Sequence, residues 1–474
     1  MSLVSTGFLL FLLAGVIVYY IIPKKMQWVW LLVLSCFYYL CSGYKTIIFI
    51  ITTTIVTYFA GVFLNKENER IKNIPAQADR SEKKKIKEDV KRRKKLIVAL
   101  LLVIIFGILA VIKYHTFAIE NINAVIGVFT GKYDTIPTFK LLLPLGISFY
   151  TFQSAGYIID VYRDKYECCN NIFKFALFVS FFPQIMQGPI GRYDRLSPQF
   201  NEPHYFSLEN TEYGLQLMLW GFFKKIVIAD RIGVVADKVF LHPYDYNGIF
   251  VIVGVLAYCL QLYADFSGGM DVVSGAAELY GIRLDKNFRQ PFFSKSIGEF
   301  WRRWHITLGT WMKDYIFYPM SLSKGMNKLS KWGKKHLGNH LGRTLPICFA
   351  NLVIFFIVGI WHGAEVRYIA YGLYNGIIIA FSNLCEPIYK KGLEKFHING
   401  DGRGWKIFKI IRTFILVNIG WIFDCCALGM RTAVKMMTEM FTKLNVQLLT
   451  WDIFKQFELK PKDYIVIAVG CVVI

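Results

Sequence analysis

Long apolar runs dominate the chain and predict helices that cross a membrane. Residues 3–22, 46–64, 96–112 and 347–360 contain no charged side chain. A helix needs roughly 20 apolar residues to cross the hydrocarbon core of a bilayer, and these runs approach or reach that length. A soluble helical protein would instead space its apolar residues along one helix face. The pattern therefore predicts an all-α, polytopic membrane protein.

Between residues 141 and 384 the hydrophobic segments change character, because polar and helix-breaking residues interrupt them. The segment 141–153 is interrupted by a proline and a glycine and ends on Gln153, and the segment 181–192 contains two prolines and two glycines. Non-helical backbone and polar side chains are tolerated at membrane depth only where protein or enclosed water satisfies them. We therefore expect broken or re-entrant helices around a cavity or tunnel in this region.

The pattern divides the chain into three parts. Residues 1–140 predict N-terminal spans joined by a basic loop at 65–95, residues 141–385 form the core with the polar breaks, and residues 386–474 predict C-terminal transmembrane helices. The last apolar run, 464–474, has eleven residues, too few for a span. We therefore expect that the chain is cut short inside its last helix.

Composition and charge agree with a membrane protein. Of the 474 residues 55% are hydrophobic and only 19% are charged, which excludes a disordered chain. The 55 Lys and Arg residues exceed the 33 Asp and Glu residues, giving a net charge of +22. A nucleic-acid-binding protein would spread basic residues over a folded surface, whereas here they lie in the connections between apolar runs. We expect membrane lipids, and no nucleic acid, as partners.

The distribution of basic residues predicts the orientation. The loop 65–95 holds 13 basic and six acidic residues, so the positive-inside rule places it in the cytoplasm. Lys24 and Lys25 follow the first run where a signal-peptide cleavage site would lie, so this run is an uncleaved span that begins outside. The cluster 91–95 could bind anionic lipid, but a topology signal on a solvated helix face is the favoured interpretation.

The cysteines predict little chemistry. The ten cysteines include the adjacent pairs Cys168-Cys169 and Cys425-Cys426 but no C-x-x-C spacing. We expect no structural disulfide and no metal site. Palmitoylation of Cys168 and Cys169 is an alternative to their burial as small apolar residues, which is favoured.

His362 is the strongest candidate for chemistry, because it ends the apolar run that starts near residue 345 and is followed by Gly363, which would allow the backbone to turn. An ionisable residue at the edge of a span is a functional hypothesis by default. Residues 321–343 carry six Lys and Arg residues and no acidic one, which places them in the cytoplasm. The helix then runs outward, and His362 lies towards the extracytoplasmic side.

His305 is the second candidate. If residues 300–311 form one helix, Trp301, Trp304, His305 and Leu308 share a face at positions i, i+3, i+4 and i+7. An imidazole on such an aromatic face stays neutral, because desolvation disfavours the cation, and a proton acceptor has to be neutral. The alternative is an ordinary buried histidine without a role in chemistry.

A neutral imidazole near the outside, in a chain with a polar path from the inside, suggests group transfer across the membrane. His362 would act as a general base that takes a proton from an attacking hydroxyl, a role worth typically 10²–10⁴-fold in rate. The chain contains no G-x-S-x-G, Walker or H-E-x-x-H motif. Hydrolase, nucleotide-driven and zinc mechanisms therefore have no motif to support them.

Several motifs together resemble the membrane-bound O-acyltransferases, and most of all their alginate O-acetyltransferase branch. They are, in chain order, Leu143-Pro-Leu-Gly-Ile-Ser-Phe-Tyr-Thr-Phe-Gln153 with Asp160-Val-Tyr-Arg163, Phe182-Pro-Gln184 with Gly188-Pro-Ile-Gly-Arg192, Asp265-Phe-Ser-Gly268, Arg302-Arg-Trp-His305 and Trp361-His-Gly363. The resemblance covers residues 141–375 in detail. It extends more distantly to the D-alanyl transfer protein of teichoic acids.

The resemblance implies a helical ring with a thinned centre, in which a tunnel leads an acyl thioester to an outside acceptor. His362 matches the catalytic histidine of the family, and His305 matches its second polar residue, often Asn or His. Arg192, Arg302 and Arg303, with Trp304, would meet the phosphate or pantetheine groups of the donor. Alternatively, Arg302 and Arg303 extend to lipid headgroups.

By the same resemblance, the protein is a cell-membrane enzyme that moves an acyl group, most simply acetyl, to the hydroxyls of an extracytoplasmic polysaccharide. The donor would be acetyl-CoA or an acyl-carrier thioester, a substrate rather than a bound cofactor. Transfer is direct or passes through an extracytoplasmic SGNH-type partner. The alternatives are D-alanyl transfer to teichoic acid, a proton-coupled flippase or transporter, and a structural scaffold.

Overall fold

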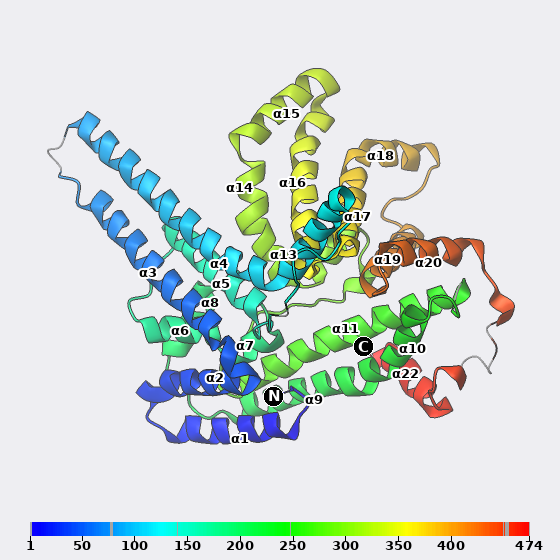
Figure 1. The fold of residues 1–474 in the computed structure, drawn as a ribbon, viewed down its shortest axis with the longest axis horizontal. Coiled ribbons are helices and arrows are strands. Elements are labelled where there is room, and N and C mark those ends of the chain that lie inside the picture. Colours follow the sequence, from blue (N-terminus) through cyan, green and yellow to red (C-terminus); the bar gives the residue numbers. More distant parts are fainter. Residues whose placement is uncertain are drawn as a thin grey trace. The chain divides into compact units, whose positions relative to one another are not determined.

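A computed structural model describes the protein over residues 2–75, 79–139, 141–246, 248–448, 450 and 455–473. Within these ranges every regular element is a helix, which confirms the all-α prediction (Figure 1).

Several helices are long and apolar enough to span a bilayer. Four stretches of the described chain meet this condition: Lys24–Lys72, Arg80–Thr130, Ile249–Glu278 and Asn339–His362. A fifth would be the pair Val366–Leu384 and Glu386–Lys395, which is bent by 57°. The first apolar run of the sequence forms a shorter helix of 16 residues. The chain is a multi-pass membrane protein.

The helices form two compact units. The first comprises Met1–Met218 and Asp271–Asp285, and the second comprises Leu219–Met270 and Lys286–Ile474. These boundaries differ from those of the three parts expected from the sequence, and that division stays a prediction.

The first unit contains α1 (Thr6–Ile21), α2 (Gln27–Gly43), α3 (Ile47–Lys72), α4 (Arg80–Thr130), α5 (Ile147–Tyr162), α6 (Ile172–Ser180), α7 (Phe182–Gln187), α8 (Tyr193–Asn201) and most of α9 (Leu208–Phe222).

The described part of the basic region 65–95 is mostly helical, which agrees with the solvated helix face favoured for residues 91–95. Helices α3 and α4 continue through it and lie side by side (Figure 1). Opposite charges on the two helices explain the extension: Arg70 pairs with Glu67 at 2.7 Å and with Asp89 at 3.3 Å, and Arg93 pairs with Asp89 at 3.0 Å. Such pairs support exposed helices at three- and four-residue spacing.

The predicted breaks in the middle of the chain are confirmed. Helix α5 starts only after Gly146, whose φ is +65° and whose Cβ, if present, would lie 2.5 Å from the carbonyl oxygen of Ile185. Only glycine accepts this conformation and this close approach. Gln153 is 1% exposed, and α7 ends after six residues at Gln187.

The second unit contains the end of α9, a π-helical turn (Phe223–Ala229), α10 (Asp230–Leu241), most of α11 (Ile249–Glu278), α12 (Ile297–Arg303), α13 (Ile306–Met312), a second π-helical turn (Lys313–Phe317), α14 (Tyr318–Ser321), α15 (Lys324–Leu337), α16 (Asn339–His362), α17 (Val366–Leu384), α18 (Glu386–Lys395), α19 (Arg403–Cys425), α20 (Met430–Thr442) and α22 (Pro461–Val473).

Helices α16 and α17 pack closely against each other, because two glycines leave room at their contact. A Cβ on Gly372 would overlap the carbonyl oxygen of Phe355, and a Cβ on Gly359 would lie 2.5 Å from the carbonyl oxygen of Tyr368. Small residues at helix crossings are typical of membrane proteins. Trp421 of α19 and Tyr371 of α17 belong to the hydrophobic core beside this crossing.

Candidate active site

His362 is the last residue of α16, as the sequence predicts. Its imidazole is half-buried and is surrounded by aromatic rings. The ring centroids lie 5.0 Å from Trp361, 5.5 Å from Tyr371 and 6.3 Å from Tyr368. Aromatic side chains from both α16 and α17 therefore surround the imidazole.

The glycine after His362 provides space rather than a turn. Gly363 has a φ of −173°, an extended conformation that any residue adopts. A Cβ at this position would overlap the ring of Tyr368, which lies at 18° to the plane of the imidazole. Glycine was expected at position 363 because it allows the backbone to turn. The structure shows a different reason: without a side chain at this position, Tyr368 can lie next to His362.

His305 lies between two helices rather than inside one. Helix α12 ends at Arg303 and α13 begins at Ile306, so the predicted single helix over residues 300–311 is wrong. His305 itself has a φ of +46°, in the left-handed region. A residue with a side chain in this region costs roughly 1–3 kcal/mol and is held there by its surroundings.

The segment before α12 provides those surroundings, because it takes the backbone hydrogen bonds that a continuous helix would have used. The N–H of Arg289 donates to the carbonyl of Arg303 at 2.9 Å, and the N–H of Ile306 donates to the carbonyl of Asn287 at 3.0 Å. The helix face that the sequence suggested is therefore not formed.

The side chain of Asn287 fixes the tautomer of His305. The backbone N–H and the hydroxyl of Thr307 lie 2.9 Å and 3.0 Å from Oδ1 of Asn287. A backbone N–H can only donate, so this atom of Asn287 is the amide oxygen. Nδ1 of His305 lies 3.3 Å from the same oxygen and must therefore carry the hydrogen. Nε2 is left with a lone pair.

His305 is a neutral acceptor in this environment. The residue is 3% exposed, and Phe266 packs edge-to-face on it at 5.0 Å. Burial, followed by the electrostatic effect of His362, lowers the pKa of His305 to about 3. Its Nε2 atom has no hydrogen-bond partner among the described residues. The imidazole can therefore accept a hydrogen bond from a molecule that enters the site.

Trp361 contacts both histidines. Its ring lies 5.8 Å from the ring of His305 and 5.0 Å from that of His362, between centroids. The structure thus brings together the two residues that the sequence singles out, although 57 positions (362 − 305) separate them in the chain.

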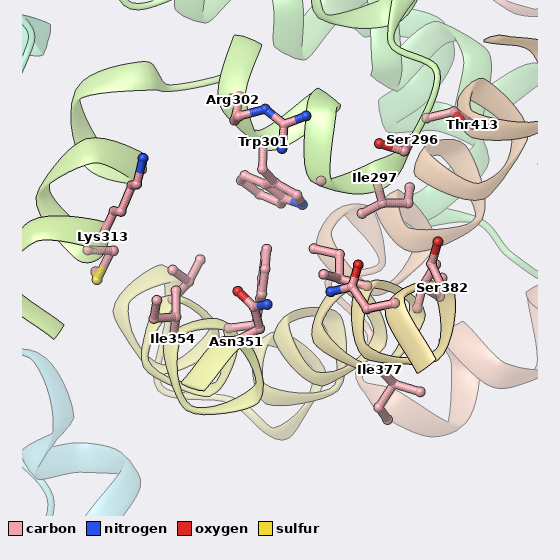
Figure 2. Close-up of a pocket in the computed structure, with 18 of the residues that line it drawn as sticks. Ser296, Ile297, Trp301, Arg302, Lys313, Asn351, Ile354, Ile377, Ser382 and Thr413 are labelled. Atoms are coloured by element: carbon pink, nitrogen blue, oxygen red, sulfur yellow. The ribbon is translucent and has the colours of Figure 1, made fainter. Parts of the chain in front are cut away.

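A cavity of about 1020 Å³ reaches His305. It lies among α12, α13, α16, α17 and α19, and Trp301 extends into it from α12 towards Asn351 of α16 (Figure 2). Polar and charged side chains share its lining with apolar ones: Ser296, Arg302, His305, Thr310, Lys313, Asn351, Ser382, Asn383, Arg412 and Thr413. The cavity expected in the middle of the chain is therefore present, although His362 is not among the described residues that line it.

The cavity extends along α16 and α17. Its lining residues come from 351–358 of α16, ending about one turn before His362, and from 377–383 of α17, the half away from His362. By the predicted orientation the α17 residues lie in the cytoplasmic half of their helix. Three cations line the cavity, Arg302, Lys313 and Arg412, and in the described lining no carboxylate opposes them.

The other residues predicted to bind the donor have different surroundings. Arg302 lines the cavity, whereas Arg303 pairs with Glu299 at 2.7 Å. Trp304 is buried in an aromatic cluster, where it stacks on Phe300 at 5.5 Å. Arg192 belongs to the first unit, half-buried at the start of α8.

Sequence reasoning missed Asn287 and the residues around Arg367. Asn287 lies 18 positions before His305, outside any helical spacing. The Asp265-Phe-Ser-Gly motif was recognised, and the structure shows its local role. Phe266 packs on His305, and Ser267 lies 3.1 Å from Nζ of the buried Lys224.

The structure shows where the first pair of adjacent cysteines lies. Cys168 and Cys169 are buried, as favoured. Within the described ranges, no cluster of three His, Cys, Asp or Glu side chains could hold a metal ion.

The sequence matches the model of the membrane-bound O-acyltransferase family over residues 169–430, more than half of the chain. The chain belongs to the membrane-bound O-acyltransferase family. Both histidines, Trp361 and all residues that line the cavity fall within the matched region.

Three relatives illustrate the range of this family. The chain is 37% identical over 316 residues to the probable alginate O-acetylase AlgI of Pseudomonas syringae pv. tomato, covering 66% of this chain and 55% of that protein. It is 31% identical over 343 residues to a peptidoglycan O-acetyltransferase of Helicobacter pylori, covering 67% and 59%. It is 29% identical over 293 residues to a teichoic acid D-alanyltransferase of Bacillus subtilis, covering 60% and 69%.

The chain spans between 51% and 62% of the length of the alginate O-acetylases that it matches.

Proposed function

We propose that the chain is an O-acyltransferase of the cell membrane. It moves an acetyl group from a thioester donor on the cytoplasmic side to the hydroxyls of an extracytoplasmic polysaccharide. The observation that carries this proposal is the pair of histidines on either side of Trp361, with a cavity that reaches one of them. The tunnel and the thinned centre that the resemblance implies would extend this cavity to His362.

The chemistry assigned to His362 is general-base catalysis. A nitrogen of its imidazole takes the proton of the acceptor hydroxyl while the hydroxyl oxygen attacks the thioester carbonyl carbon. The carbon–sulfur bond then breaks, and the imidazolium returns the proton to the leaving thiolate. The products are the ester and the free thiol, with no net change in protons.

His305 has a different role in this proposal. A lone pair at Nε2 cannot donate to the oxyanion of the transition state, but it can accept a hydrogen bond. A pantetheine arm carries amide N–H groups beside its thioester, and one of these would satisfy the unpartnered Nε2. The arm would lie in the cavity, with its phosphate near Arg302, Lys313 or Arg412. Either acetyl-CoA or an acyl-carrier thioester meets this description.

The names of the relatives support acetyl as the acyl group and a polysaccharide as the acceptor. An alginate O-acetylase and a peptidoglycan O-acetyltransferase are among them. An extracytoplasmic SGNH-type partner that receives the acetyl group first remains part of the proposal. D-Alanyl transfer is the second candidate, because two relatives are named teichoic acid D-alanyltransferases, at 29% and 31% identity.

Sidedness tests the proposal. Sealed membrane vesicles that hold the full-length protein, its polymer acceptor and any native partner would receive labelled acetyl-CoA, which does not cross a bilayer. Inverted vesicles, with the cytoplasmic face outward, should label the polymer, and right-side-out vesicles should not. Labelled D-alanyl carrier thioester, offered in parallel, decides between the two acyl groups. Labelling by right-side-out vesicles, or label in no polymer, would contradict acyl transfer across the membrane.

The cavity cations should control donor affinity. Arg302→Gln should raise the KM for the donor about fivefold and leave kcat unchanged, because one exposed ion pair contributes up to roughly 1 kcal/mol. Lys313→Gln should act in the same way. The control is Lys328→Gln, which removes the same charge from α15 outside the cavity. Steady-state kinetics at low and high salt measure the effect, and an unchanged KM in both cavity variants would exclude this role.

A further inference from the structure

The buried arginine Arg367 contacts Tyr368, whose ring lies next to the imidazole of His362. It is in the first turn of α17 and is only 6% exposed. A buried guanidinium is costly unless several groups bind it. The groups that bind Arg367 therefore indicate what this buried guanidinium does.

Two groups other than Tyr368 bind the guanidinium. Nε and NH2 of Arg367 form a fork with the carboxylate of Glu365, at 2.7 Å and 3.1 Å. NH1 donates to the backbone carbonyl of Asp424, at the end of α19. The side chain of Asp424 in turn accepts a hydrogen bond from the hydroxyl of Tyr258 on α11, at 2.7 Å. The guanidinium is thus bound to the residue that precedes α17 and to the end of α19, where the side chain of Asp424 connects to α11.

The remaining contacts of Arg367 are with Tyr368. NH2 donates to the hydroxyl of Tyr368 at 2.9 Å, and the guanidinium carbon lies 4.3 Å from the centroid of the same ring. A cation over an aromatic face contributes roughly 0.5–2 kcal/mol, more when it is desolvated. Tyr368 therefore contacts the Arg367 guanidinium and also lies next to the His362 imidazole, in the space that Gly363 leaves free.

We propose that Arg367 is a positioning residue, which holds Tyr368 against His362 and thereby fixes the plane of the catalytic imidazole. The inference rests on the proposed function of His362. It adds that the anchored guanidinium sets the direction in which His362 takes the proton. Arg367 itself touches no reacting atom in this assignment.

The geometry explains why orientation matters here. His362 ends its helix half-buried, and the ring of Tyr368 lies at 18° to the plane of its imidazole. Proton transfer requires a nearly linear approach, and misplacement by about 1 Å can cost about 100-fold in rate. Neither Arg367 nor Tyr368 is among the described residues that line the proposed donor cavity. Loss of the contact between Arg367 and Tyr368 should therefore lower kcat and leave the KM for the donor unchanged.

Three substitutions test the contact between Arg367 and Tyr368. Arg367→Lys keeps the charge but cannot bind Glu365, Asp424 and Tyr368 together, and we expect kcat to fall about 10-fold or more. Tyr368→Leu removes the ring and should lower kcat at least as far. Tyr368→Phe keeps the ring and loses only the hydroxyl, so its loss should be smaller. The KM for the donor should stay within about twofold in all three variants.

The double variant separates positioning from independent effects. If Arg367 acts through Tyr368, Arg367→Lys combined with Tyr368→Leu should be no slower than Tyr368→Leu alone. If the two losses multiply, the proposal is overturned. It is also overturned if Arg367→Lys has wild-type kcat, or if its donor KM rises as much as its kcat falls.

A matched arginine controls for general destabilisation. Arg231 also binds a carboxylate, that of Asp463 at 3.3 Å, and two backbone carbonyls, those of Ile226 and Val227. Arg231→Lys should keep wild-type kcat, and an equal fall would reduce Arg367 to a structural role. His362→Ala is measured in parallel. If His362→Ala retains activity, the proposed function fails. If His362→Ala is inactive and Arg367→Lys has wild-type kcat, only the positioning role of Arg367 is overturned.

Discussion

Replacement of His362 by alanine is expected to abolish acyl transfer while the protein still folds. General-base catalysis contributes typically 10²–10⁴-fold, so the remaining transfer should be at most about 1% of the wild-type rate. The fold should survive, because the imidazole is only half-buried and ends its helix. The measurement is incorporation of labelled acetyl groups into the polymer, beside the unfolding temperature of the purified protein.

The control for this variant is another histidine of the same unit. His336 is exposed on α15, where its ring lies 5.4 Å from that of Trp332. His336→Ala should retain the wild-type rate, since its imidazole is exposed and is not among the described residues that line the cavity. A parallel loss in both variants would point to general damage.

The same substitution separates the alternative functions. A proton-coupled transporter would move its substrate without ever incorporating acetyl groups, in the wild type as in the variant. A scaffold would be indifferent to the loss of one imidazole. If His362→Ala incorporates acetyl groups at the wild-type rate, His362 is not the general base. A structural scaffold would then describe the protein better.

The sequence predicted the elements that depend on local composition. A proline and a glycine break the segment before α5, and the apolar run that becomes α16 ends on His362. Hydrophobic length and helix-breaking residues act within a few positions, so a linear pattern reveals them. The family resemblance then connected the two histidines, which residue spacing alone could not bring together.

The errors arose where distant segments decide the local structure. The aromatic pattern around His305 favours one helix, but hydrogen bonds to residues 287–289 break it. The basic region 65–95 connects two apolar runs, yet most of its described residues are helical, with one ion pair between α3 and α4 and another within α4. Arg367 was overlooked because its partner Asp424 lies 57 positions further along the chain.

The role of His305 leads to a prediction based on its backbone. With a φ of +46°, the position favours residues that tolerate the left-handed region, and asparagine is among the best of those with a side chain. His305→Asn can place its amide N–H towards Asn287 and its oxygen towards the cavity. We expect it to keep acyl transfer within about 10-fold of the wild type.

His305→Leu should behave differently, although leucine is closer to the imidazole in volume. It offers no acceptor and is unfavourable at this φ. We expect acyl transfer to fall about 100-fold or more, and the unfolding temperature to fall as well. Equal rates for the Asn and Leu variants would contradict the acceptor role, and thermal unfolding of both distinguishes lost chemistry from lost structure.

The Asn287→Asp substitution tests the neutral state of His305 directly. In the wild type the pKa of His305 is about 3, so the ring stays neutral above about pH 4 and its titration adds no acid limb to activity between pH 5 and 8. A carboxylate against Nδ1 favours the imidazolium and raises this pKa. Below the raised pKa Nε2 is protonated and no longer accepts, so activity should fall with falling pH and recover at alkaline pH.

The pH profile of kcat/KM measures this fall in activity. The new acid limb should vanish when His305→Asn is combined with Asn287→Asp, because no imidazole is left to titrate. If the limb persists in the double variant, or never appears in the single one, the hydrogen on Nδ1 does not control this site.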